Sequence, residues 1–182
     1  MVITLILALA VTSSSFADEI SLQEKVDAIE AAHVAVNPIK QNLMKAIQAA
    51  MAKTGPEGAI GSCKTEAPQI THSTNSKIEV GRTSLKLRNP KNAARPWMQS
   101  VLKKYENWKP GEAIEPEILL KLGRNHYGYM EPIFIKETCL SCHGKSVSKP
   151  VKTELNQIYP KDSAIGFNLG ELRGFFWAEL KP

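Results

Sequence analysis

Cysteine and histidine are scarce in this 182-residue sequence, which contains three cysteines and four histidines. An odd number of cysteines leaves at least one thiol without an intramolecular disulfide partner. Neither a second C-x-x-C pair nor a paired H-x-x-x-H occurs, so the four ligands of a structural zinc site are missing. Internal repeats and low-complexity tracts are also absent. The length and a composition of 43% hydrophobic and 23% charged residues indicate one ordinary globular domain.

Long hydrophobic runs are missing except at the N-terminus. Residues 2–11 are apolar, but this run is about half of the ~20 residues needed to span a bilayer. The small residues Ser15 and Ala17 fit the signal peptidase site of an exported protein. The sequence therefore predicts a signal peptide over residues 1–17, a single mature domain over residues 18–182 and a periplasmic location.

Acidic residues are outnumbered, because 18 Asp and Glu face 23 Lys and Arg, which gives a net charge of +5. A basic exterior favours acidic protein partners or anionic lipid. Nucleic acid is not an expected partner, since the cations are scattered and no nucleic-acid module is recognisable.

The most informative stretch is Cys139-Leu140-Ser141-Cys142-His143, followed by Gly144. In a C-x-x-C-H sequence the two thiols attach covalently to haem, and the histidine binds its iron. A thioredoxin-type redox dithiol is the alternative, but that motif normally opens a helix within a βαβ pattern, which is absent here. We expect one covalent haem c, held by Cys139, Cys142 and His143.

The second axial position of the iron has several candidates. They are Cys63, His33, His72, His126, Met44, Met51, Met98 and Met130, besides an open site. The methionines on helices are expected to pack in the core, so Met130, in a strand, is the best methionine. His33 is expected to be a hydrogen-bonded core histidine and His72 to be solvated, whereas His126, at the start of a strand, could reach the cofactor region. Cys63 stands apart, because iron coordination would deprotonate and protect the odd thiol.

Local patterns predict an α+β domain with one antiparallel sheet. Ser21 and Glu24 form a capping box at the start of a long helix that is expected to bend near Pro38 and to end at residues 54–56. One face of this helix carries a stripe of mostly apolar residues, which is expected to pack on the domain core rather than to form a dimer seam. The stripe positions are Leu22, Val26, Ile29, His33, Val36, Lys40, Leu43 and Ile47.

The remaining elements follow from turn residues and periodicity. Short helices are predicted over residues 58–66 and 116–122, and a further helix begins at Pro96. Strands are predicted over residues 78–87 and 126–136. Residues 144–162 are predicted to form a loop, and the apolar runs 165–169 and 172–180 a β-hairpin.

Several segments together resemble a known family. They are residues 59–63, 82–92, 129–133, 139–144, 159–162 and 166–174, in this order. In these segments the chain is similar to the single-haem c-type proteins with a PAS-like fold that are called Tll-like haem domains. The resemblance implies a central antiparallel sheet flanked by helices, one covalent haem and an unusual His/Cys axial pair. Carried over to this sequence, that pair is His143 and Cys63.

Three classes of function are compatible with these observations. The leading one is an exported c-type cytochrome that senses redox state or a gas, or carries single electrons to a redox or signalling protein partner. A haem enzyme of peroxidase or nitrogen-oxide reductase type is the alternative, and it requires an open iron site with Arg124 and His126 as acid-base groups. A haem-stabilised interaction module would use the long helix as a homodimer seam. We expect a protein without enzymatic activity.

Overall fold

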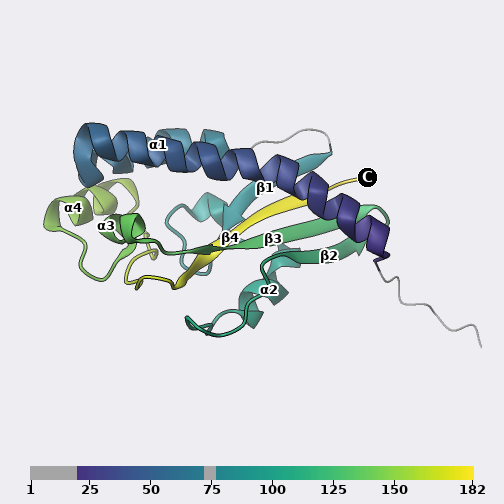
Figure 1. Cartoon of the computed structure of the whole chain (residues 1–182). Coiled ribbons are helices and arrows are strands. Elements are labelled where there is room, and N and C mark those ends of the chain that lie inside the picture. The colour runs from purple at the N-terminus through teal and green to yellow at the C-terminus, as the bar shows by residue number, and fades with distance from the viewer. Residues whose placement is uncertain (1–19, 72–76) are drawn as a thin grey trace, which may run out of the picture.

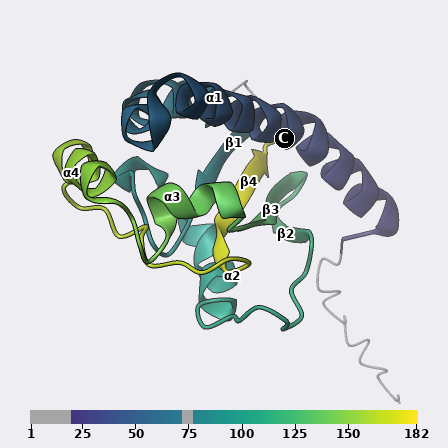
Figure 2. The same cartoon turned by 60° about the vertical axis from the view of Figure 1, so that its left-hand side comes forward.

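One four-stranded antiparallel sheet, in the order β1-β4-β3-β2, carries helices on both faces (Figures 1 and 2). The computed structural model describes residues 20–71 and 77–182, so the predicted signal peptide and His72 lie outside the described residues. The strands are β1 (Ile78–Thr83), β2 (Ile118–Gly123), β3 (His126–Phe134) and β4 (Leu172–Leu180). The helices are α1 (Leu22–Thr71), α2 (Gln99–Lys104), α3 (Leu140–His143) and α4 (Lys149–Ile158). The predicted α+β class is confirmed.

The long helix α1 begins at the predicted capping box. The Ser21 backbone N–H donates to the Glu24 carboxylate at 2.9 Å, and the Glu24 N–H donates to Ser21 Oγ at 3.2 Å. The hydrogen bonds from Ser21 lower the pKa of Glu24 to about 2. Gly55, with φ 71° and ψ 179°, is the one residue of α1 with non-helical angles, so the helix passes through Pro38 unbroken. Gly55 separates a first segment, residues 22–54, from a second segment, residues 56–71, which turns back (Figure 1).

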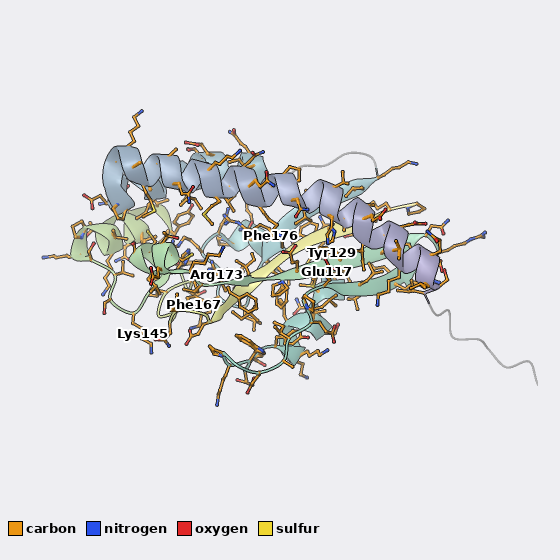
Figure 3. All side chains as sticks on the ribbon, in the orientation of Figure 1. Glu117, Tyr129, Lys145, Phe167, Arg173 and Phe176 are labelled. Carbon is orange, nitrogen blue, oxygen red and sulfur yellow. The ribbon has the colours of Figure 1, made fainter. Side chains whose placement is uncertain are left out.

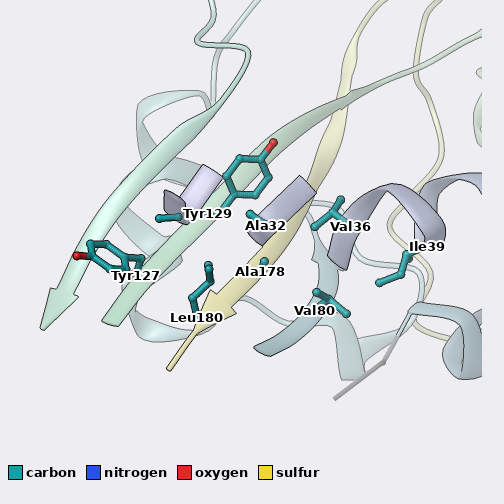
Figure 4. Close-up of a cluster of buried hydrophobic side chains, with 9 residues drawn as sticks. Ala32, Val36, Ile39, Val80, Tyr127, Tyr129, Ala178 and Leu180 are labelled. Atoms are coloured by element: carbon teal, nitrogen blue, oxygen red, sulfur yellow. The ribbon is translucent and has the colours of Figure 1, made fainter. Parts of the chain in front are cut away.

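The first segment of α1 packs on one face of the sheet, as expected, but through a shifted stripe. Its buried residues are Ala28, Ala32, Val36, Ile39 and Leu43, of which the first four pack against Val80, Tyr127, Tyr129, Ala178 and Leu180 (Figure 4). Leu22 and Val26 of the predicted stripe are 78% and 42% exposed. Alanine side chains are small, so they let the helix approach the strands closely.

The other face of the sheet is covered by α2 and the turn before it, Pro96–Met98. Met98, Val101 and Tyr105 pack there against Met130 and Trp177. The helix predicted to begin at Pro96 is therefore confirmed. The two faces of β3 also separate as predicted, with Tyr127 and Tyr129 facing α1 and Met130 facing α2.

Three local predictions were wrong. Residues 118–123 form strand β2, which pairs with β3, rather than a helix, since a short apolar run fits either element. Residues 149–158 form α4 rather than a loop; Val151 and Leu155 are buried one turn apart, after Pro150 in the first turn. Residues 165–169 do not form a hairpin with β4, whose partners are β1 and β3. Phe167 instead forms an isolated parallel bridge with Gly144.

Candidate functional site

A cavity of about 780 Å³ brings together the four residues that the sequence singled out. Cys63 reaches it from the second segment of α1, whereas Cys139, Cys142 and His143 reach it from the turn Glu137–Cys139 and from α3. Strand β3 ends just before this turn, so the sheet fixes where the motif begins. The volume lies within the range of about 300–1,000 Å³ that is typical of ligand and cofactor sites.

The imidazole of His143 is held in one orientation and one tautomer. Its Nδ1–H donates to the carbonyl oxygen of Ala164 at 2.6 Å, and the ring of Phe167 packs against it edge-on. This hydrogen bond leaves the lone pair of Nε2 available for a metal. Burial, together with the nearby Arg173 and Arg88, lowers the pKa of His143 well below its ordinary value. The side chain is therefore neutral, as a metal ligand must be.

Backbone hydrogen bonds hold the segment that carries His143. The N–H groups of Gly166 and Phe167 donate to the carbonyls of Gly144 and His143 at 3.1 and 3.0 Å. The run 165–169, which the sequence assigned to a hairpin, thus supports the C-x-x-C-H motif. The loop that supplies the Ala164 carbonyl also supplies these two donors.

Arg88 was not recognised from the sequence as a site residue, although it belongs to a segment that carries the family resemblance. Its guanidinium donates to the carbonyl of Cys142 and forms an ion pair with Asp162 at 3.0 Å. It also reaches the Ala164 carbonyl at 3.4 Å. Arg88 therefore joins the motif to the loop that orients His143. The sequence feature that could have indicated this role is that Arg88 and Asp162 both lie in segments that resemble the family.

The three thiols at the cavity are free and half-buried. Burial raises the pKa of Cys142 and of Cys63, and Arg82 and Arg88 oppose this rise at Cys63. The sulfur of Cys142 also lies 3.9 Å from the carbonyl of Pro56. The two guanidiniums favour a thiolate at Cys63, which is the form that binds iron.

The guanidinium groups of Arg82, Arg88 and Arg173 line the cavity, and among the described ion pairs only Arg88 has a carboxylate partner, Asp162. The buried Nε atom of Arg82 has no hydrogen-bond partner among the described residues. Burial, then the repulsion of Arg82 and Arg88, lowers the pKa of Arg173 to about 9. Figure 3 shows Arg173 and Phe167 at the same end of the sheet as α3. This surplus of positive charge suits a ligand that carries carboxylates.

The donor set fits a covalently attached haem. Two thiols suit the attachment, an imidazole and a third thiol suit the two axial positions, and the guanidiniums suit the two propionate carboxylates. The unpaired Arg82 Nε–H supports this fit most directly, because burying a guanidinium N–H without an acceptor costs free energy that a propionate oxygen would recover.

The methionine candidates are placed differently from the expectation. Met44 and Met51 line the cavity. Met130 and Met98 are completely buried between the sheet and α2, so the ranking of Met130 as the best methionine was wrong. The alternation of residues in β3 predicted the correct face for Met130, but it could not show where the cavity lies relative to that face.

Neither described candidate histidine lines the cavity. His33 forms a hydrogen bond with Glu117 and packs edge-on against Tyr129, so it is hydrogen-bonded as expected, but its side chain is 38% exposed and does not lie in the core. His126 bonds Glu179 at 3.0 Å instead of approaching the cavity. His126, which the sequence left open as a candidate ligand, therefore does not reach the cavity.

Residues 20–71 and 77–182 contain no group of three or more His, Cys, Asp or Glu side chains arranged to hold a metal ion. Within the same ranges, no helix has the length and apolar character needed to cross a membrane.

Comparison with known proteins gives one family and one solved structure. The model of the Tll0287-like family matches residues 13–179. No curated protein matches the chain. The crystal structure of the cyanobacterial heme-protein Tll0287 is similar to this chain, with a TM-score of 0.60 and a sequence identity of 20%. The similarity covers 88% of this chain and 96% of that chain. At this identity the similarity shows the shared fold.

Proposed function

The chain belongs to the Tll0287-like family, and from this membership and the cavity we propose that it binds one covalent haem c and exchanges single electrons. The observation that carries the proposal is the convergence of Cys63 with Cys139, Cys142 and His143 on one cavity. Cys63 lies far from the motif in the sequence, so local sequence preference does not explain this meeting. The printed name of the similar structure, a heme-protein, agrees with this proposal.

Each cavity residue has a stated task in this proposal. Cys139 and Cys142 would hold the haem covalently, and His143 Nε2 and the Cys63 thiolate would bind its iron. A thiolate ligand stabilises ferric iron and gives a low reduction potential, whereas a methionine ligand would raise it. The haem, when bound, supplies one-electron chemistry; the chain orients the residues that would bind its iron and partly shields them from water.

The proposed role is that of an electron carrier, or of a redox sensor whose partner protein reads the oxidation state. Two protein ligands leave no open iron position for a substrate, so we propose no catalytic role. Arg124 and His126, which the enzyme alternative requires, do not line the cavity. Export to the periplasm is part of the proposal, since c-type haem is attached on the outer side of the bacterial inner membrane.

Covalent attachment is tested by intact mass spectrometry of protein made in cells that attach haem c. We expect a mass increase of one haem that survives extraction with acidified acetone. The Cys139→Ala/Cys142→Ala variant should lose this increase, whereas Cys63→Ser should keep it. Complete extraction of haem from the parent protein, or its absence from a folded parent, would contradict the proposal.

A further inference from the structure

A second, smaller cavity of about 360 Å³ adjoins the first one. The two cavities share Arg88, Asn89 and Tyr159 in their walls. We call the smaller one the basic cleft; it lies between the second segment of α1, the turn at residues 88–91 and the residues that follow α4. Its position next to the proposed haem site raises the question of what it binds.

The basic cleft has four cations and no acidic residue in its lining. Arg88 is neutralised by Asp162. Lys64, Lys91 and Lys161 are exposed, and the structure gives none of them an ion pair with a described residue. Some lysines elsewhere do pair, such as Lys40 with Glu131, Lys104 with Glu115 and Lys181 with Glu79; what sets the three cleft lysines apart is that they gather around one cavity whose described lining has no carboxylate. The three cleft lysines thus leave their positive charge available to a partner.

The walls between these lysines are apolar and stiff. Pro68, Pro90, Pro160 and Ile158 supply surface without side-chain hydrogen-bond donors. The turn that carries Lys91 is fixed, because the Lys91 backbone N–H donates to the Asn89 side chain at 3.0 Å. An apolar centre inside a charged rim is the usual anatomy of a protein interface. A preformed shape also lowers the entropy cost of binding.

We propose that the basic cleft is the docking surface for the acidic face of a one-electron partner protein. This inference rests on the proposed function and names the chemistry of its partner. Arg88 lines the cleft and donates to the Cys142 carbonyl, so a protein seated there is one side chain away from the haem-attachment motif. In the exchange a reduced flavin or iron–sulfur partner loses one electron and the iron gains it; no bond forms or breaks.

The test measures electron transfer from a reduced acidic flavodoxin to the haem-loaded protein by stopped flow, between 10 and 200 mM NaCl. In the Lys64→Glu/Lys91→Glu/Lys161→Glu variant we expect a rate constant about tenfold lower at low salt, with a weaker salt dependence. The control is Lys25→Glu/Lys103→Glu/Lys109→Glu, which changes three exposed lysines outside the cleft by the same total charge. Its rate constant should fall by less than about threefold. Equal effects of the two triple variants would overturn the inference, because net charge alone would then explain the rates.

A second measurement does not depend on electron transfer. Titration of the full mature protein with a hexaglutamate peptide should shift the backbone amide NMR signals of residues 64, 91 and 161, and the triple cleft variant should lose the response. Shifts elsewhere, or equal shifts with inorganic phosphate at the same charge concentration, would overturn docking of an acidic protein. If the purified protein carries no covalent haem, the proposed function fails, while this titration still decides whether the cleft binds an acidic chain.

Discussion

At the scale of single residues, Arg82 is the side chain whose removal should change the redox chemistry most selectively. Its guanidinium lines the cavity, and its Nε–H donates to no atom of the described residues. A nearby cation stabilises the reduced form, which carries one positive charge less. At an effective dielectric constant of about 20, a unit charge on the order of 10 Å away contributes roughly 1–2 kcal/mol. We therefore expect Arg82→Gln to lower the reduction potential in a spectroelectrochemical titration.

The control for this prediction is Arg124→Gln. Arg124 is exposed in the turn between β2 and β3, where solvent screens its charge, so its removal should leave the potential unchanged. An Arg82→Gln protein with the parent potential and full haem content would contradict the electrostatic role of Arg82.

At the scale of elements, the turn within α1 determines where Cys63 lies. Gly55 combines φ 71° with ψ 179°, a conformation that side chains strongly disfavour. Gly55→Ala should therefore lower the free energy of unfolding by about 1–3 kcal/mol. A Cβ at Gly55 would meet no atom within 4 Å, so the effect would come from the backbone alone. Urea unfolding, followed by circular dichroism, measures it.

Gly61→Ala is the matched control in the second segment of α1. A Cβ at Gly61 also meets no atom within 4 Å, but the backbone there is helical. Alanine is the better helix former, so we expect no loss of stability and a gain of up to about 1 kcal/mol. Equal losses in the two variants would show that the conformation of Gly55 does not limit stability.

Some of the helices and strands could be predicted from local sequence, and others could not. The capping box at Ser21, the interruption near Gly55 and the strand from His126 each rest on local chemistry, and the structure contains all three. Strand β2 could not be predicted as a strand, because its short apolar run owes its form to pairing with β3. The run 165–169 likewise owes its conformation to backbone bonds with residues 143 and 144, which are distant in the sequence.

At the scale of the whole molecule, only the part of the candidate site that forms a contiguous motif could be predicted residue by residue from the sequence. Cys139, Cys142 and His143 follow from five consecutive letters, whereas Cys63 was one of several candidates, favoured by the odd cysteine count and by the family resemblance. The Arg88 link to Cys142 and Asp162 joins three separate segments, so no local pattern contains it. Met44 and Met51, rather than Met130, reach the cavity because α1 and α2 cover opposite faces of the sheet.

Cys63 and His143 are proposed to bind one iron together, and the electron-transfer role rests on this coordination. The most direct measurement is the absorption and EPR spectrum of the ferric, haem-loaded protein beside its Cys63→Ser variant. We predict a low-spin thiolate signature in the parent that disappears in the variant, with the covalent haem retained in both. An identical spectrum in the two proteins would remove Cys63 from the iron and make Met44 and Met51 the next ligands to test. A high-spin parent spectrum would contradict two-ligand coordination altogether.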